Sequence, residues 1–114
     1  MSKNIKKYSS LISNYHNLGK KTHISIEKNL DKKLIPLINE ICHNLLNQNV
    51  NISKKQKNKL RRHKNLLKCS ANKKISNAKK IKKIGQQGKG LFLPLLFSIV
   101  TPLLTSLLNK KNKK

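Results

Sequence analysis

Apolar residues recur at helical spacing between about residues 31 and 49, and this pattern predicts an amphipathic helix that faces a hydrophobic core. Pro36 is compatible with the helix because it falls in the first turn if the helix begins near Lys33. The apolar stripe is made of Leu34, Ile35, Ile38, Ile41, Cys42, Leu45 and Leu46.

A shorter apolar pattern near the N-terminus predicts another, short helix. Gly19 follows this pattern, and we expect it to end the helix in the left-handed conformation that glycine adopts readily. The apolar residues of the pattern are Ile5, Tyr8, Leu11, Ile12 and Tyr15.

Two further helices are predicted in the middle of the chain. Ser53 and Gln56 have the spacing of a capping box, so one helix should run from Lys54 to about Cys69. The other should start at Ser76 and end at Gly85. Each has only a narrow apolar edge to pack against a core. The edge is made of Leu60, Leu66 and Leu67 in the first helix, with His63 as a further candidate, and of Ala78, Ile81 and Ile84 in the second.

Residues 91–108 form a segment without any charge. As a straight helix it would be about 27 Å long, close to the ~30 Å of a bilayer core, and Pro102 should kink it. It could span a membrane as an anchor, act on a membrane or pack against a partner, or form a core helix. The core helix is the weakest reading, because the other helices offer little apolar surface to enclose the segment. The candidates for membrane contact are Leu91, Phe92, Leu93, Leu95, Leu96, Phe97, Leu103, Leu104, Leu107 and Leu108.

These elements predict an all-α protein, and 114 residues allow one small domain at most. We expect the termini to be disordered. The expected parts are a flexible N-terminal segment with a possible short helix over 1–30, a basic helical unit over 31–84, a glycine hinge over 85–90, a kinked hydrophobic helix over 91–108 and a basic tail over 109–114.

Charge changes this picture, because the chain has 27 Lys and Arg against 3 Asp and Glu, a formal net charge of +24. Fifteen of the cations lie within residues 51–90, which contain no acid. Self-repulsion of this size opposes compaction unless an anion neutralises it. The sequence therefore predicts a polyanionic partner, which is nucleic acid, an acidic membrane surface or both.

The acid-free block is suited to contacts with DNA phosphates, which carry affinity but no sequence information. Its cations are thirteen Lys and two Arg, and no aromatic residue between 51 and 90 could stack on unpaired bases. We therefore predict non-specific binding to double-stranded DNA. The candidate phosphate ligands are Lys54, Lys55, Lys57, Lys59, Arg61, Arg62, Lys64, Lys68, Lys79, Lys80, Lys82 and Lys83.

Other readings of the basic block remain open. It could be a solvated face or a nuclear localisation signal. The whole chain could be a membrane-anchored or membrane-lytic protein whose cations bind acidic lipid headgroups. A basic RNA-associated protein is a third reading, which the missing aromatic residues weaken.

Catalysis and metal binding are not expected. Three acids and no Trp supply little material for acid–base pairs or an aromatic pocket, so we predict a non-enzymatic protein without a cofactor. Cys42, His43, His63 and Cys69 are zinc-ligand types, but they form no closely spaced Cys–Cys or His–His pair. Cys42 lies on the apolar stripe and is expected to be a small core residue.

The order of these segments resembles a family of viral proteins. The basic body followed by Gly85-x-x-Gly-x-Gly-Leu-Phe-Leu-Pro-Leu-Leu is similar to the precursors of adenovirus core protein X. Residues 31–108, with Leu60-Arg61-Arg62-His63-Lys64, look still more like the small late proteins of adintoviruses and Polinton elements. This resemblance implies a virion component that condenses a linear double-stranded DNA genome, located in the virion and the host nucleus.

The resemblance also implies processing by a viral maturation protease. Gln86-Gln87-Gly88-Lys89 followed by Gly90 is similar to the sites of the adenoviral cysteine protease, although Gln86 stands where Met, Ile or Leu is usual. Cleavage between Lys89 and Gly90 would separate the basic part, for DNA, from the apolar tail, for a membrane or the capsid.

Overall fold

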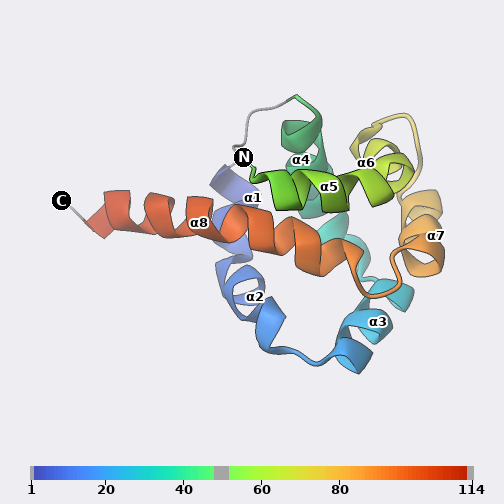
Figure 1. Ribbon diagram of the computed structural model, residues 1–114, viewed down its shortest axis with the longest axis horizontal. Coiled ribbons are helices and arrows are strands. Elements are labelled where there is room, and N and C mark those ends of the chain that lie inside the picture. Colours follow the sequence, from blue (N-terminus) through green and yellow to red (C-terminus); the bar gives the residue numbers. More distant parts are fainter. Residues whose placement is uncertain (1, 48–51, 113–114) are drawn as a thin grey trace.

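The computed structural model describes the backbone of residues 2–47 and 52–112, and the side chains of residues 4–47 and 52–102. The described chain is helical and contains no strand, so the predicted all-α class is confirmed (Figure 1). Its elements are α1 (Ser2–Lys7), α2 (Ser9–Asn14), the 3-10 helix η1 (Tyr15–Asn17), α3 (Lys20–Lys28), the 3-10 helix η2 (Lys32–Leu34), α4 (Ile35–Leu46), α5 (Lys54–Arg62), α6 (Lys64–Ala71), α7 (Asn77–Gln87) and α8 (Phe92–Asn112).

The first half of α8 is the centre of the hydrophobic core. Figure 1 shows α8 crossing the middle of the molecule, with α5 on one side and α2 and α3 on the other. Phe92, Leu93, Leu96 and Val100 are fully buried, and Phe97 is almost so. The expectation that the other helices could not enclose this segment is therefore wrong for residues 92–100. Within the described residues, no helix has both the length and the apolar character needed to cross a membrane.

The N-terminal residues supply the apolar surface that the sequence analysis did not count on. Ile5 of α1, Ile12 of α2 and Tyr15 of η1 are all buried in the same core as α8. The described part of the segment 1–30 is therefore packed on the core, which corrects the expectation that this segment is flexible. The single short helix predicted here is instead two, because the chain leaves helical geometry at Tyr8, with φ −106° and ψ 24°.

Gly19 has a different role from the predicted one. Its φ is −71° and its ψ is 165°, so the backbone is extended there and not left-handed. The preceding 3-10 helix already ends at Asn17, and Gly19 is the N-cap of α3. The helix α3 itself was not predicted from the sequence.

The two strongest local predictions are confirmed. Pro36 lies in the first turn of α4, and the predicted stripe is buried at Ile35, Ile38, Ile41, Cys42 and Leu45. Leu46, which was also predicted on the stripe, is instead 41% exposed. The capping box of α5 is also present. The Gln56 amide donates to Ser53 Oγ at 3.2 Å, and the Ser53 amide donates to Gln56 Oε1 at 3.0 Å.

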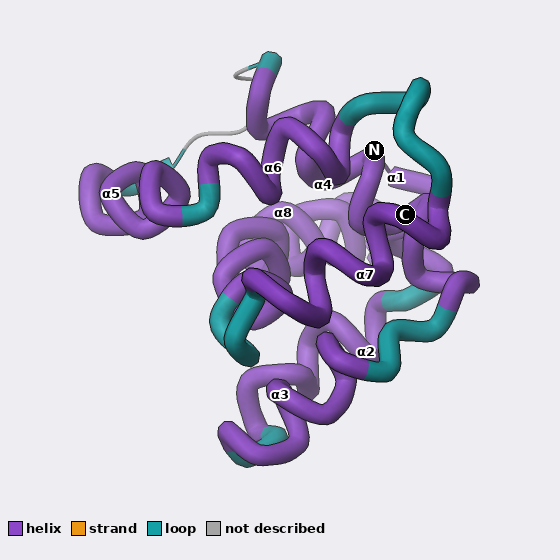
Figure 2. The backbone as a smooth tube through the Cα atoms, turned by 90° about the vertical axis from the view of Figure 1, so that its right-hand side faces the viewer, coloured by secondary structure: helices purple, strands orange, loops and turns teal. Residues whose placement is uncertain are grey.

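The helix predicted from Lys54 to Cys69 is divided into α5 and α6. The break is at His63, whose φ is −112° and ψ 23°, and Figures 1 and 2 show that the chain changes direction there. The His63 ring lies beside Phe92 of α8, with 5.8 Å between the ring centroids. The local sequence contains no Pro or Gly and gives no signal for this break. The break coincides with the packing of His63 against α8.

The glycine-rich segment 85–90 is packed and not a free hinge. Gly85 does not end α7, which continues to Gln87. Gly88 and Gly90 lie against α3, where a Cβ on Gly88 would overlap the Glu27 carboxylate and one on Gly90 would meet Ile24 at 2.6 Å. Gly90 also has a φ of +76°, which favours glycine.

The second half of α8 continues through Pro102 as a helix to Asn112. The predicted kink at Pro102 stays a prediction. The side chains of Leu103, Leu104, Leu107 and Leu108 lie outside the described part of the chain, as do residues 1 and 113–114, on which the prediction of disordered termini falls.

Candidate nucleic-acid interface

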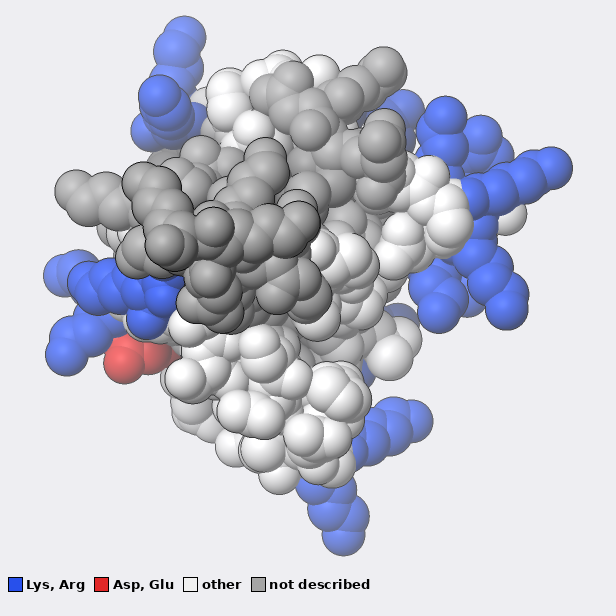
Figure 3. All heavy atoms as spheres, turned by 90° about the vertical axis from the view of Figure 1, so that its left-hand side faces the viewer, with Lys and Arg blue, Asp and Glu red and all other residues white. Residues whose placement is uncertain are grey.

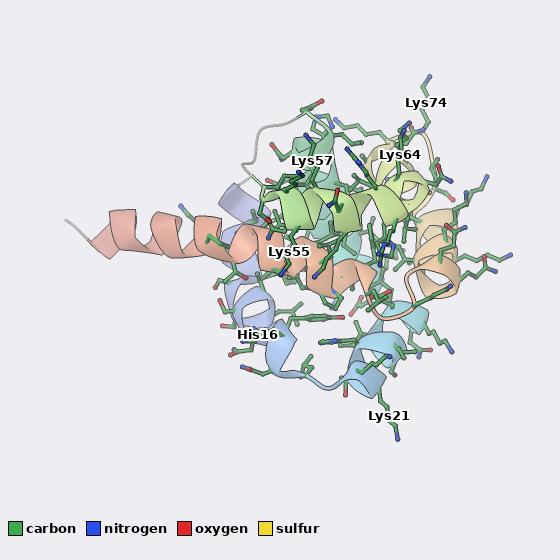
Figure 4. The ribbon with its side chains drawn as sticks, viewed as in Figure 1. His16, Lys21, Lys55, Lys57, Lys64 and Lys74 are labelled. Carbon is green, nitrogen blue, oxygen red and sulfur yellow. The ribbon has the colours of Figure 1, made fainter. Side chains whose placement is uncertain are left out.

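The helix α5 presents most of its surface to solvent. Its buried apolar residue is Leu60, which joins the core that contains α8. Figure 4 shows Lys55 and Lys57 on α5 and Lys64 where α6 begins. The exposed cations of α5 are Lys54, Lys55, Lys57, Lys59, Arg61 and Arg62, so all six predicted on this helix are accessible.

The cations of α6 and α7 are less uniform. Lys64, Lys68, Lys79 and Lys82 are exposed, whereas Lys83 is partly buried. The helix α6 contacts both α5 and α7, so the exposed cations of these three helices lie on neighbouring elements.

Lys80 corrects the list of predicted phosphate ligands. Its side chain is only 2% exposed, and Nζ donates to Asn39 Oδ1 of α4 at 3.0 Å. Burial lowers the pKa of the Lys80 amine, while the nearby Cys69 and Cys42 act in the opposite direction. Lys80 therefore belongs to the interior contact between α7 and α4 and cannot reach a phosphate in this conformation.

The three acidic residues of the chain all precede α5, and each accepts a hydrogen bond from another residue. Glu27 is buried beneath the start of α8, where its carboxylate accepts hydrogen bonds from the amides of Gly90 and Leu93. Asp31 accepts from the Lys33 amide, and Glu40 accepts from Asn4 Nδ2. In the view of Figure 3, the largest group of Lys and Arg side chains lies at the edge opposite the acidic atoms that are visible.

A small polar hollow lies where α5 meets α6. Its volume is about 130 Å³, and Arg61, Arg62, Lys64 and the end of α7 at Gln87 contribute to its lining. Burial lowers the pKa of His63 in the same lining, and the nearby charges of Arg62 and Lys89 lower it further. The hollow therefore combines permanent cations with a histidine that favours its neutral form.

The predicted cleavage site lies in the packed glycine segment. Lys89 is exposed and has a φ of +54°, but Gly90 is buried and its amide donates to Glu27 Oε1 at 3.2 Å. A protease needs an extended segment, so the bond between Lys89 and Gly90 is accessible only after this loop has opened locally.

The cysteine and histidine candidates are not brought together into a metal site. Among the residues whose side chains are described, no three His, Cys, Asp or Glu side chains are grouped so that they could hold a metal ion. Cys42 is fully buried, which confirms its predicted place in the core, and burial raises its pKa to about 12. Its thiol is thus protonated at neutral pH, which is unlike an activated nucleophile.

Comparison of the chain with models of protein families, with curated proteins and with solved structures finds no match. The assignment of function therefore depends on the geometry and charge described above. The similarity to adenoviral and adintoviral proteins stays a prediction.

Glu27 and the cations outside the basic block were not among the predicted functional residues. The burial of Glu27 could have been suspected because this acid lies close to the apolar residues Ile24 and Ile26. Its hydrogen-bond partners could not be found in this way. Further exposed cations lie on α1 and α3, in the segment that was expected to be flexible. They are Lys6, Lys7, Lys20, Lys21 and Lys28.

Proposed function

We propose that this protein is non-enzymatic and binds double-stranded DNA non-specifically through its phosphates, with α5 and the start of α6 as the main contact surface. The observation that carries the proposal is the six exposed cations on the nine residues of α5, within a block that contains no acid. The capping box and the contact with α8 fix the position of this helix.

The size of α5 is consistent with this contact. Nine helical residues extend over about 13 Å. Duplex DNA carries one charge per ~1.7 Å of its axis, so several phosphates lie within reach of one helix of this length. Since Lys predominates and the block has no aromatic residue, the expected contacts position the protein without reading base sequence.

Condensation of DNA is part of the proposal because cations also lie on elements far from α5. Lys20, Lys21 and Lys28 of α3 are exposed, as are Lys6 and Lys7 of α1. Figure 3 shows Lys and Arg side chains projecting from several edges of the molecule. One molecule with α5 on a first duplex therefore keeps cations free for a second duplex.

A place in the virion and the host nucleus belongs to the same proposal and is supported by the resemblance to viral core proteins. The proposed membrane or capsid contact of the apolar segment is limited to Leu91 and to residues beyond 100, because residues 92–100 form the core. Release of this tail by a protease requires the loop that holds Gly90 against Glu27 to open first. A membrane-lytic protein is correspondingly less well supported.

Binding of fluorescent 20-base-pair duplexes to Lys→Gln variants tests this proposal. The triple variant Lys55→Gln, Lys57→Gln, Lys59→Gln on α5 should weaken binding at least about tenfold, to the same extent for two duplexes of unrelated sequence. The control with the same change in charge is Lys20→Gln, Lys21→Gln, Lys28→Gln on α3, which should weaken it less. Equal weakening by both variants would show that net charge, and not α5, determines binding.

A further inference from the structure

A second surface feature lies beside α5 and is not explained by phosphate binding. It is a groove of about 460 Å³ between the C-terminal half of α5, the start of α8 and η1. This volume lies in the range of small-molecule sites, which is about 300–1,000 Å³. The groove is lined by His16, Lys59, Arg62, His63, Leu91, Pro94, Leu95 and Ser98.

The floor of the groove is apolar and continues along α8. Leu91 is 54% exposed, which is the largest value among the large hydrophobic residues whose side chains the structure describes. A second, mainly apolar hollow of about 260 Å³ follows on the side of α2 and shares His16, Pro94 and Ser98 with the groove. The two hollows are therefore neighbours on α8.

The rim of the groove toward α5 is cationic. Lys59 and Arg62 contribute to it, and its lining includes no carboxylate. The pKa of His63 is lowered by burial and by its cationic neighbours, so at neutral pH its ring favours the uncharged form. A ligand in the groove therefore meets two fixed cations on the α5 side and apolar surface on the α8 side.

We propose that this groove binds a single-chain anionic amphiphile such as a long-chain fatty acid. The carboxylate lies between Lys59 and Arg62, and the acyl chain lies on Leu91 and Pro94 and continues toward the second hollow. A phosphate of DNA would use the cations but leave the apolar floor in water, and an uncharged chain would use only the floor. An anionic amphiphile is the ligand class that uses both, and this inference does not depend on the proposed function.

The experiment is a titration of the full-length protein with laurate, below its micelle concentration and in ~150 mM salt, followed by NMR. Dodecyltrimethylammonium, with the same chain length and the opposite charge, is the reference ligand. We expect one saturable laurate site, with intermolecular NOEs from the acyl chain to the Leu91 and Leu95 methyl groups, and clearly weaker binding of the cationic surfactant.

Three variants locate the site. Lys59→Gln, Arg62→Gln should weaken laurate binding about five- to tenfold, whereas Lys54→Gln, Lys57→Gln, which removes the same charge from α5 outside the groove, should change it less than twofold. Leu91→Glu places a carboxylate in the groove at an exposed position and should weaken binding more than tenfold. Thermal unfolding of each variant checks that the fold is retained.

The proposal is overturned if the cationic surfactant binds as tightly as laurate, if both double variants lose affinity equally, or if Leu91→Glu binds laurate like the parent protein. Each of these results would show that laurate binds through net charge or through unspecific apolar contact.

Discussion

At the scale of single residues, Glu27 is a buried carboxylate that bonds to the backbone of another segment. It is 1% exposed, and its carboxylate oxygens accept hydrogen bonds from the amides of Gly90 and Leu93 at 3.2 Å each. These amides precede or begin α8, where helical bonds do not satisfy them. Glu27 thus connects α3 to the start of the central helix.

Replacing Glu27 by Ala should lower the free energy of unfolding by about 2–5 kcal/mol, because two buried amide groups lose their acceptor. Urea-induced unfolding followed by circular dichroism measures the change. Asp31→Asn is the matched control, since it raises net charge by the same amount at an exposed position and should cost less than ~0.5 kcal/mol. An equal effect of both variants would mean that charge, and not the bonds to α8, is responsible.

The effect of Glu27 should also depend on pH. Burial raises the pKa of its carboxyl above the ordinary value of 4.5, and the bonds from Leu93 and Gly90 and the charge of His23 oppose this shift only in part. A raised pKa in the folded state means that the contribution to stability is fully present below pH 4.5 and is lost as pH rises through the folded-state pKa. Glu27→Ala should therefore destabilise the protein more at pH 4.5 than at pH 7.5.

Lys80 shows that not every cation of the chain is accessible to a ligand. Lys79 is exposed, and Lys80 is buried against Asn39. We predict that Lys79→Met weakens duplex binding about two- to fourfold, whereas Lys80→Met leaves it within ~1.5-fold of the parent. Fluorescence anisotropy at one salt concentration measures both. If Lys80→Met weakened binding as much as Lys79→Met, the buried position of its amine would be wrong.

At the scale of elements, α8 is a core helix over its first half. Leu96→Ala should lower the free energy of unfolding by about 2–5 kcal/mol, because it leaves a cavity at a fully buried position. Leu91→Ala is the same chemical change at an exposed position five residues earlier, and it should cost less than ~0.5 kcal/mol. Denaturant unfolding in water, without lipid or detergent, distinguishes them. Similar values for the two would contradict the core position of α8.

The elements that could be predicted from the sequence are those specified by nearby residues. The capping box of α5 involves Ser53 and Gln56 alone, and the stripe of α4 follows from its own spacing. The exposed cations of α5 could be predicted for the same reason. No contact with another segment is needed to identify them.

The remaining features depend on residues far apart in the chain. The break at His63 accompanies packing against Phe92, and the burial of α8 needs Ile5, Ile12 and Tyr15 from the N-terminal segment. A pattern read within one window cannot show such partners. Lys80 shows the same limit in the candidate site. It lies in a basic run like its neighbours, and only the approach of α4 makes it interior.

At the scale of the whole molecule, one core contains residues from both ends of the described chain. Buried residues of α1, α4, α6 and α8 belong to the same cluster. The basic part and residues 92–100 are therefore one structural unit. The glycine segment between them connects α7 to α8 within this unit and does not separate two domains.

A chain that ends at Lys89 should consequently fail to fold, because it lacks the helix around which the others pack. We expect far-ultraviolet circular dichroism of this truncated chain to show no cooperative thermal transition, whereas the full chain shows a single one. A cooperative transition in the truncated chain would mean that residues before the glycine segment have their own core.

The central claim is that exposed cations of α5 bind DNA phosphates, and the salt dependence of duplex affinity tests it most directly. If about eight phosphates are neutralised, log K should fall with log salt concentration with a slope near −7. The triple variant Lys55→Gln, Lys57→Gln, Lys59→Gln should reduce the magnitude of this slope by about 2.7, because each lost contact removes ~0.9. An unchanged slope in the variant, or duplex binding that does not respond to salt, would contradict the account.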